Sequence, residues 1–286
     1  MLRRLTLWLV VIFIGLSPGL CEEVAYAFRE VPCELDHAAL SDYNGSEMIT
    51  FTVAGGSDGY RISHEKSAAA TKEDFDKRVD ICHPTVVYES RLLASEYPGD
   101  YTIEQVCSIY DNVSKSWNYI PDPIGREYYC YANETIKLGR EVGLAGVGDC
   151  DDFAILMAAL IGNIGGLTRI VMAYGGPYGN HAYTEVYLGK MNTENRNVER
   201  IIESLKEKYN TEDINCHINM STDDAWLNLD RGTDPNTPSP PGRSFHLAKD
   251  HMPIFIGDLE NKVPIMPPNE LPSAVFAFAS NAGVPT

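Results

Sequence analysis

Helical spacing of apolar residues dominates the middle of the chain. The pattern begins near Thr71, and residues 103–117 carry apolar side chains at helical spacing behind Thr102 and Gln105, which have the spacing of a capping box. A Pro-x-Pro turn then ends this helix, because each proline disfavours helical geometry in the residue before it. Another helix begins at Cys150 and is apolar on nearly every side until two glycines end it, which predicts a buried helix.

After the buried helix, the apolar pattern changes from helical to alternating. Residues 169–173 and 181–188 are expected strands joined by a glycine-rich loop, and residues 225–229 are a third strand. Between them, residues 195–209 carry one apolar stripe among charged positions, which is typical of an amphipathic surface helix. Alternation in the second strand predicts one face made of His181, Tyr183, Glu185 and Tyr187.

These elements divide the chain into four predicted parts. Residues 1–27 are a signal peptide or N-terminal anchor, and residues 28–70 are a small annex with one expected strand at 48–53. Residues 71–240 form the main domain, and residues 241–286 are a C-terminal extension. The chemistry is therefore expected within residues 71–240.

The first residues predict export. Two arginines precede an apolar run over residues 5–16, which is short for a membrane span of roughly 20 residues but suits a signal peptide. Cleavage would fit after Cys21 or after Ala27, and an uncleaved anchor helix is the alternative. We expect an exported protein, either secreted or anchored to the outer face of the membrane through this apolar segment.

Composition narrows the class of partner. The 286 residues are 44% hydrophobic, which is enough to bury a core, and they carry 40 acidic against 23 basic side chains, a formal charge of −17. That charge disfavours nucleic acid and anionic lipid surfaces, because both attract clustered lysine and arginine. The seven cysteines fit neither a compact disulfide scaffold nor a paired zinc site, and their pairing stays open.

Three residues hold positions from which they could act together. Cys150 opens the buried helix, His181 opens a strand and Asp230 closes another. The helix dipole favours a thiolate by about 0.3–1 kcal/mol, but three neighbouring aspartates oppose it, so an imidazolium would be needed. His181 could supply that charge, and Asp230 could fix its tautomer. From the residues alone, a structural cysteine, a surface histidine and a turn aspartate remain the alternative.

Metal chelation has little support in the sequence. The acidic run 149–152 does not match an EF-hand loop, because Phe153 stands where the third acidic ligand belongs. Cys216 and His217 are adjacent in the chain and so are poorly placed to chelate one ion. We expect no metal and no cofactor, and the remaining histidines, among them His246, show no partner pattern.

Short motifs in a fixed order resemble the transglutaminase-like superfamily. The motifs lie in residues 146–156, 165–171, 181–186 and 226–230. Upstream, residues 110–123 are similar to the helix and turn that precede the nucleophile in microbial members. The resemblance covers about residues 100–235. It implies an α+β fold with a papain-like core, in which the cysteine-bearing helix packs on an antiparallel sheet that carries the histidine and the aspartate.

The resemblance also implies a role for each of the three residues. Cys150 would be the nucleophile, His181 the general base and acid, and Asp230 the carboxylate that orients the histidine. Because the inserted helix is long, Asp234 remains an alternative to Asp230. The reaction would be acyl transfer, in which a thiolate attacks an amide, a thioester forms, and water or an amine releases the acyl group.

The chain departs from the superfamily pattern around the cysteine. Animal cross-linking members have Gln and Trp beside the cysteine, where this chain has Asp149 and Asp151, and Tyr183 stands where Trp is common. These changes favour a hydrolase acting on peptide or isopeptide bonds of a protein or peptide substrate, with Asp149, Tyr178 and Tyr183 lining the cleft. The alternatives are a non-catalytic peptide- or envelope-binding module, an amine-accepting protein cross-linker and a structural surface protein.

Overall fold

The structure is a computed structural model that describes residues 72–122, 127–191, 194, 196–232, 238–257 and 262–268. The expected signal segment, the annex and its strand at 48–53 lie outside these residues. Among the helices that the structure describes, none is long and apolar enough to cross a membrane.

Six helices are described, and five of them lie where the sequence shows a helical pattern. They are α3 (Lys72–Val79), α4 (Pro84–Ala94), α5 (Ile103–Lys115), α6 (Ala132–Glu141), α7 (Cys150–Asn163) and α8 (Asn197–Tyr209). Pro84 occupies the first turn of α4, and His83 caps it by accepting a 3.1 Å hydrogen bond from the Thr85 N–H. The N–H of Thr102 donates to Gln105 at 3.2 Å, which is one half of the expected capping box of α5.

Five strands form one sheet in the order β5-β6-β4-β3-β7, and every neighbouring pair is antiparallel. Their bounds are β3 (Thr168–Gly176), β4 (Gly179–Lys190), β5 (Cys216–Asn219), β6 (Asp224–Asn228) and β7 (Asp250–Ile256). Two short strands, β1 (Trp117–Tyr119) and β2 (Gly146–Gly148), pair in parallel directly before α7. The expected α+β fold, with the cysteine-bearing helix against an antiparallel sheet, is confirmed.

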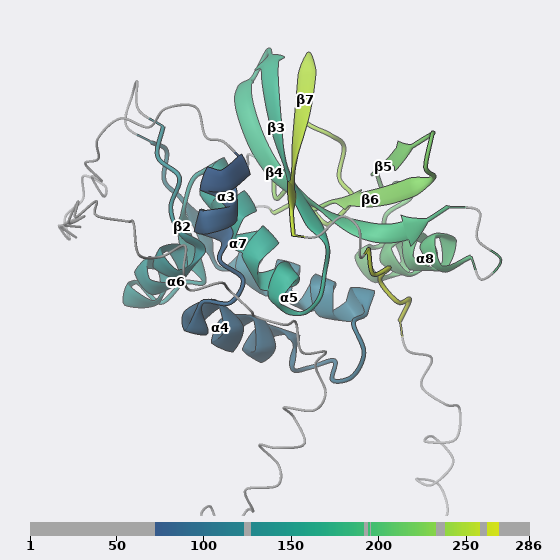
Figure 1. Cartoon of the computed structure of the whole chain (residues 1–286), viewed down its shortest axis with the longest axis horizontal. Helices are drawn as coiled ribbons and strands as arrows, with labels where there is room; N and C mark the ends of the chain where they lie inside the picture. The colour runs from purple at the N-terminus through teal and green to yellow at the C-terminus, as the bar shows by residue number, and fades with distance from the viewer. Residues whose placement is uncertain are drawn as a thin grey trace, which may run out of the picture.

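The helix α7 lies between the sheet and the other helices. Figure 1 shows α3, α4, α5 and α6 around α7, with β3, β4 and β7 on its other side. Nearly every side chain of α7 is buried, as its continuous apolar pattern predicts. The hydroxyl of Thr184 in β4 donates to the carbonyl oxygen of Ala154 in α7 at 2.6 Å and ties the two elements together.

The two faces of β4 have separate environments. Ala182, Val186 and Leu188 join the main core with α7, whereas Tyr183 and Tyr187 pack in two smaller clusters on the opposite face. This division confirms the alternation read from the sequence. A bulge between Tyr187 and Gly189 shifts the pairing of β4 with β6, so the register that aligns these two strands is irregular at one point.

Five elements of the domain were missed at the sequence level, among them the short strands β1 and β2. The helix α6 has only a short apolar stripe, with Ala132, Thr135, Ile136 and Gly139 as its buried residues. The strand β5 is four residues long and half exposed. The strand β7 lies beyond residue 240, yet it pairs with β3 from Asp250 opposite Tyr174 to Ile256 opposite Thr168. The predicted division of the chain at residues 27, 70 and 240 stays a prediction.

Candidate active site

Cys150 is the first residue of α7, and a turn at Gly148 precedes it. Gly148 has φ +149°, a conformation that other residues rarely adopt, and a Cβ there would lie 2.2 Å from the Oδ2 of Asp152. Asp149 then occupies the N-cap position. The thiol of Cys150 is partly buried, and Cys150 is a free cysteine, as are Cys107, Cys130 and Cys216, whereas Cys82 is disulfide-bonded.

His181 and Asp230 form a buried pair. The Nε2 of His181 lies 3.0 Å from the Oδ1 of Asp230, and the two residues are 9% and 4% exposed. The N–H of Gly232 also donates to this Oδ1 at 2.8 Å, and the Nη1 of Arg243 lies 3.8 Å from the Oδ2. Burial alone would raise the pKa of Asp230, but the hydrogen bond and charge of His181 hold it below its usual value. Asp230 is therefore an ionised acceptor at neutral pH.

Cys150 lies against the strand that carries His181. The backbone N–H of Ala182, the residue after His181, hydrogen-bonds to the thiolate form of Cys150 and lowers the pKa of the thiol. Burial is the larger effect and raises that pKa well above its usual value, and the charges of Asp149 and Asp151 raise it further. Asp230 holds the Nε2 of His181, so Nδ1 is the ring nitrogen left without that bond. A thiolate here needs the compensating charge of an imidazolium.

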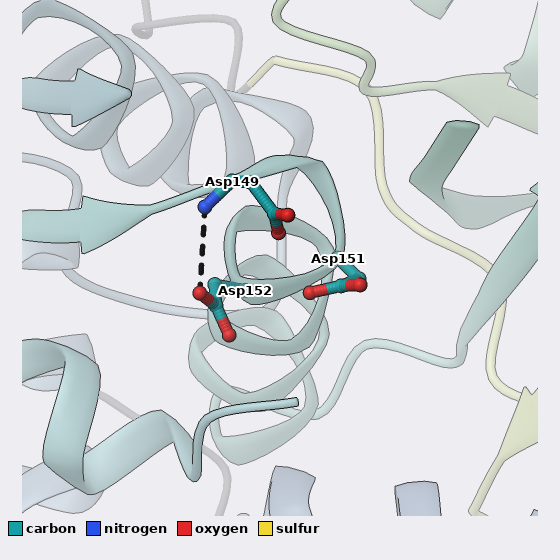
Figure 2. A group of neighbouring side chains, drawn as sticks. All are labelled: Asp149, Asp151 and Asp152. Atoms are coloured by element: carbon teal, nitrogen blue, oxygen red, sulfur yellow. Dashed lines mark hydrogen bonds between the residues drawn. The ribbon is translucent and has the colours of Figure 1, made fainter. Parts of the chain in front are cut away.

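A second feature surrounds the start of α7, namely three converging carboxylates. Figure 2 shows Asp149, Asp151 and Asp152 at the first turn of the helix, where one ligand atom from each lies within 4.8 Å of the others. Asp152 accepts hydrogen bonds from the N–H of Cys130 at 2.7 Å and from the N–H of Asp149 at 3.4 Å. Among the described residues, one oxygen of Asp149 and one of Asp151 are buried with no hydrogen-bond partner.

The carboxylates raise one another's affinity for protons. Burial and the neighbouring charges raise the pKa of Asp151 and of Asp152 well above the usual value, and burial with the charge of Asp149 raises the pKa of Asp122 to about 7. Carboxylate oxygens are the ligands that hard divalent cations take, so the three aspartates could supply part of the six to eight oxygens of a Ca²⁺ site. The expectation of no metal, based on the missing EF-hand pattern, therefore stays a prediction.

The expected cleft residues have different surroundings. Asp149 lies beside Cys150 and is buried. Tyr178 is 78% exposed at the turn between β3 and β4. Tyr183 is 1% exposed and packs beside Phe245 behind the His–Asp pair, so its side chain is part of the packing that supports the pair rather than an open surface. Asp234, the alternative to Asp230, lies outside the described residues.

Sequence reasoning missed several residues that contact the site. Tyr119 in β1 is half-exposed, and after burial the charge of Cys150 is the largest cause of the raised pKa of its phenol. Arg243 and His246 come from a segment that follows β6 and meets the His–Asp pair from outside the recognised motifs. Only the adjacency of Tyr119 to the Pro-x-Pro turn gave any signal in the sequence, since the other two follow no motif.

Fold and site together define a class of protein. A cysteine opens a buried helix, and a histidine and an aspartate pair on the antiparallel sheet against which that helix packs, which is the arrangement of papain-like cysteine enzymes. Residues 92–230 match the family model of the transglutaminase-like superfamily. This match supports a cysteine acyl-transfer or protease-like function at the level of the superfamily. No curated protein and no solved structure matches the chain significantly.

Proposed function

We propose that the protein is a cysteine hydrolase that cleaves peptide or isopeptide amide bonds through a thioester on Cys150. The observation that carries the proposal is the 3.0 Å pair of His181 and Asp230 on the strands beside a partly buried free thiol at a helix N-terminus. His181 serves as general base and acid, and Asp230 fixes its orientation and stabilises the imidazolium.

The chemical steps follow from these positions. The Cys150 thiolate attacks the amide carbonyl carbon, and the backbone N–H of Cys150 donates to the developing oxyanion. The C–N bond then breaks as the imidazolium of His181 gives its proton to the leaving amine, which leaves a thioester. His181 next takes a proton from water, whose oxygen attacks the thioester and releases a carboxylic acid and the thiolate.

The carboxylates beside Cys150 are the reason to favour hydrolysis of a protein or peptide substrate over cross-linking. Asp149 and Asp151 replace the Gln and Trp that flank the cysteine of cross-linking members. Export, with the N-terminal segment as signal or tether, is part of the proposal, since the apolar run 5–16 suits a signal peptide.

Alkylation of the folded protein by iodoacetamide across pH tests the proposal. Peptide mapping should show that Cys150 reacts near neutral pH faster than a free thiol of pKa about 8.5, and His181→Ala should abolish this reactivity. Cys216→Ala is the matched cysteine control, because that thiol lies on the edge strand β5, and it should leave the reaction at Cys150 unchanged. A Cys150 that reacts no faster than a free thiol would rule out the catalytic proposal.

The alternatives give separate results. An amine-accepting cross-linker would incorporate a labelled primary amine into a glutamine peptide, whereas the proposed hydrolase releases the free acid. A non-catalytic binding module would retain a peptide equally well after Cys150→Ala and would turn over none of it in either form.

A further inference from the structure

One segment outside the family match follows Asp230 in the chain and returns to the His–Asp pair. Residues 238–249, which we name the strap, connect the region after β6 with β7. At one end the N–H of Gly242 donates to the carbonyl of Asn228 at 2.6 Å, and at the other the N–H of Lys249 donates to the carbonyl of Tyr174 at 2.9 Å. The strap is therefore fixed to β6 and to β3.

Two side chains of the strap contact the His–Asp pair directly. The Nη1 of Arg243 lies 3.8 Å from the Oδ2 of Asp230, on the carboxylate oxygen that His181 does not use. The ring of His246 lies on the ring of His181 with 4.6 Å between centroids and 32° between planes. The Nε2 of His246 is 3.2 Å from the carbonyl oxygen of Gly179, which fixes the position of the ring at the start of β4.

The charges around His246 favour its neutral form. Burial lowers the pKa of His246, and the charges of His181 and Arg243 lower it further, against the opposing effects of Asp230 and of the bond to the Gly179 carbonyl. His251 from β7 donates to the backbone carbonyl of His246 at 3.2 Å. At neutral pH His246 therefore presents a flat, uncharged ring to His181.

We propose that His246 is a positioning residue that holds the imidazole of His181 in the orientation in which Nε2 donates to Asp230 and Nδ1 is left for the thiol. This inference rests on the proposed function for its effect on catalysis, but its effect on His181 does not depend on turnover. Without the ring of His246, one face of His181 would lose its packing, and the ring could turn about χ2. A turned ring gives up the bond to Asp230 and presents a different nitrogen to the thiol.

The first test is the tautomer of His181, read from long-range ¹H–¹⁵N NMR in the Cys150→Ala protein. The parent should show one tautomer, with the proton on Nε2. His246→Ala should give a mixture of tautomers, and His246→Phe, which keeps a flat ring in place, should restore the single tautomer. A single Nε2–H tautomer in His246→Ala would overturn the proposal, and so would a lower melting temperature with no change in tautomer.

The second test is alkylation of Cys150 near neutral pH. His246→Ala should slow the reaction about tenfold through misplacement of the imidazole, and His246→Phe should restore most of the rate. Leu247→Ala is the matched control, because Leu247 is a 62% exposed neighbour on the strap, and it should react as the parent does.

The two proposals fail in different ways. If Cys150 of the parent reacts like a free thiol, the proposed function fails, and the NMR result still decides the role of His246. If the parent reacts fast, His181→Ala does not, and His246→Ala matches the parent, then the proposed function stands and the inference about His246 falls.

Discussion

Asp230 combines a buried position with an ionised carboxylate. Its pKa is held below the usual value, so its contribution to folding is complete above the unfolded pKa of about 3.9 and is lost as the pH falls through the folded value. The same charge stabilises an imidazolium at His181. One residue therefore links stability at low pH to the protonation of His181, the proposed general base.

Asp230→Asn tests this link. The amide oxygen can still accept the hydrogen bond of His181, but the charge is gone, so alkylation of Cys150 at neutral pH should fall about tenfold or more. Asp223→Asn is the control. Asp223 is exposed, and its φ of +58° is a left-handed conformation that asparagine adopts as readily as aspartate does. An unchanged rate in Asp230→Asn would contradict the orienting role of the carboxylate.

Asp151 has the opposite electrostatic character. Because its pKa is raised in the folded state, its contribution favours folding below the unfolded pKa of about 3.9 and is lost as the pH rises toward the folded value. At neutral pH the three clustered carboxylates therefore oppose folding whenever they are all charged.

Asp151→Asn should stabilise the protein at pH 7 by about 1–2 kcal/mol, and it should reduce the gain in melting temperature that the parent shows on mild acidification. Urea unfolding and thermal melts at pH 7 and pH 5, in EDTA so that no divalent cation neutralises the cluster, measure the two effects. A destabilised variant at pH 7 would show that Asp151 is held in the folded state by interactions its charge strengthens.

Among the elements, the turn from β2 into α7 has the strictest backbone requirement. Gly148 combines a positive φ with a close approach of Asp152, so a side chain at this position meets both backbone strain and a steric clash. The same turn determines where Cys150 begins its helix.

Gly148→Ala should therefore cost about 2–3 kcal/mol of folding free energy. Gly143→Ala is the matched control, because Gly143 also has a positive φ, at +75°, but open space around its Cβ position, and it should cost only about 1 kcal/mol. Equal losses in chemical denaturation would show that strain alone, and not the contact with Asp152, makes the glycine necessary.

The sequence predicted those elements whose pattern is strong over many residues. The buried run of α7, the alternation of β4 and the amphipathic stripe of α8 each carry their own periodic signal, and the structure confirms them. The short strand β5 and the edge strand β7, which contains Pro253, have no such signal, because their pairing depends on partners elsewhere in the chain.

The same distinction applies to the site. The pairing of His181 with Asp230 followed from motifs at the ends of two expected strands, and the structure brings the two side chains together. The contacts of Arg243 and His246 arise only when the strap returns across the sheet, and nothing in the local sequence marks that return. The clustering of three aspartates was visible in the sequence, but their burial was not.

At the scale of the whole molecule, the formal charge of −17 acts on every element at once. Net charge of one sign destabilises the compact state through self-repulsion, and salt screens that repulsion. The net charge therefore lowers the stability of the fold as well as disfavouring nucleic acid and anionic lipid as partners.

Raising NaCl from about 10 mM to about 300 mM at pH 7 should increase the melting temperature by about 2–5 °C. The control is the same titration near the isoelectric point of about 4.7, where little net charge is left to screen. A melting temperature that falls with salt at pH 7 would show that attractive ion pairs, such as Arg169 with Glu185, outweigh the net repulsion.

The pairing of β4 with β6 has a consequence for how the protein can change. His181 and Asp230 are separated by 49 positions in the chain, and α8 and β5 lie between them, yet their alignment is set by the ladder that runs from Lys190 opposite Asp224 to Glu185 opposite Asn228. The length of the segment between β4 and β6 does not affect that alignment. Insertions and deletions can accumulate between β4 and β5 while the geometry of the His181–Asp230 pair is kept. A single residue lost between His181 and Glu185, by contrast, would move the histidine and the aspartate apart.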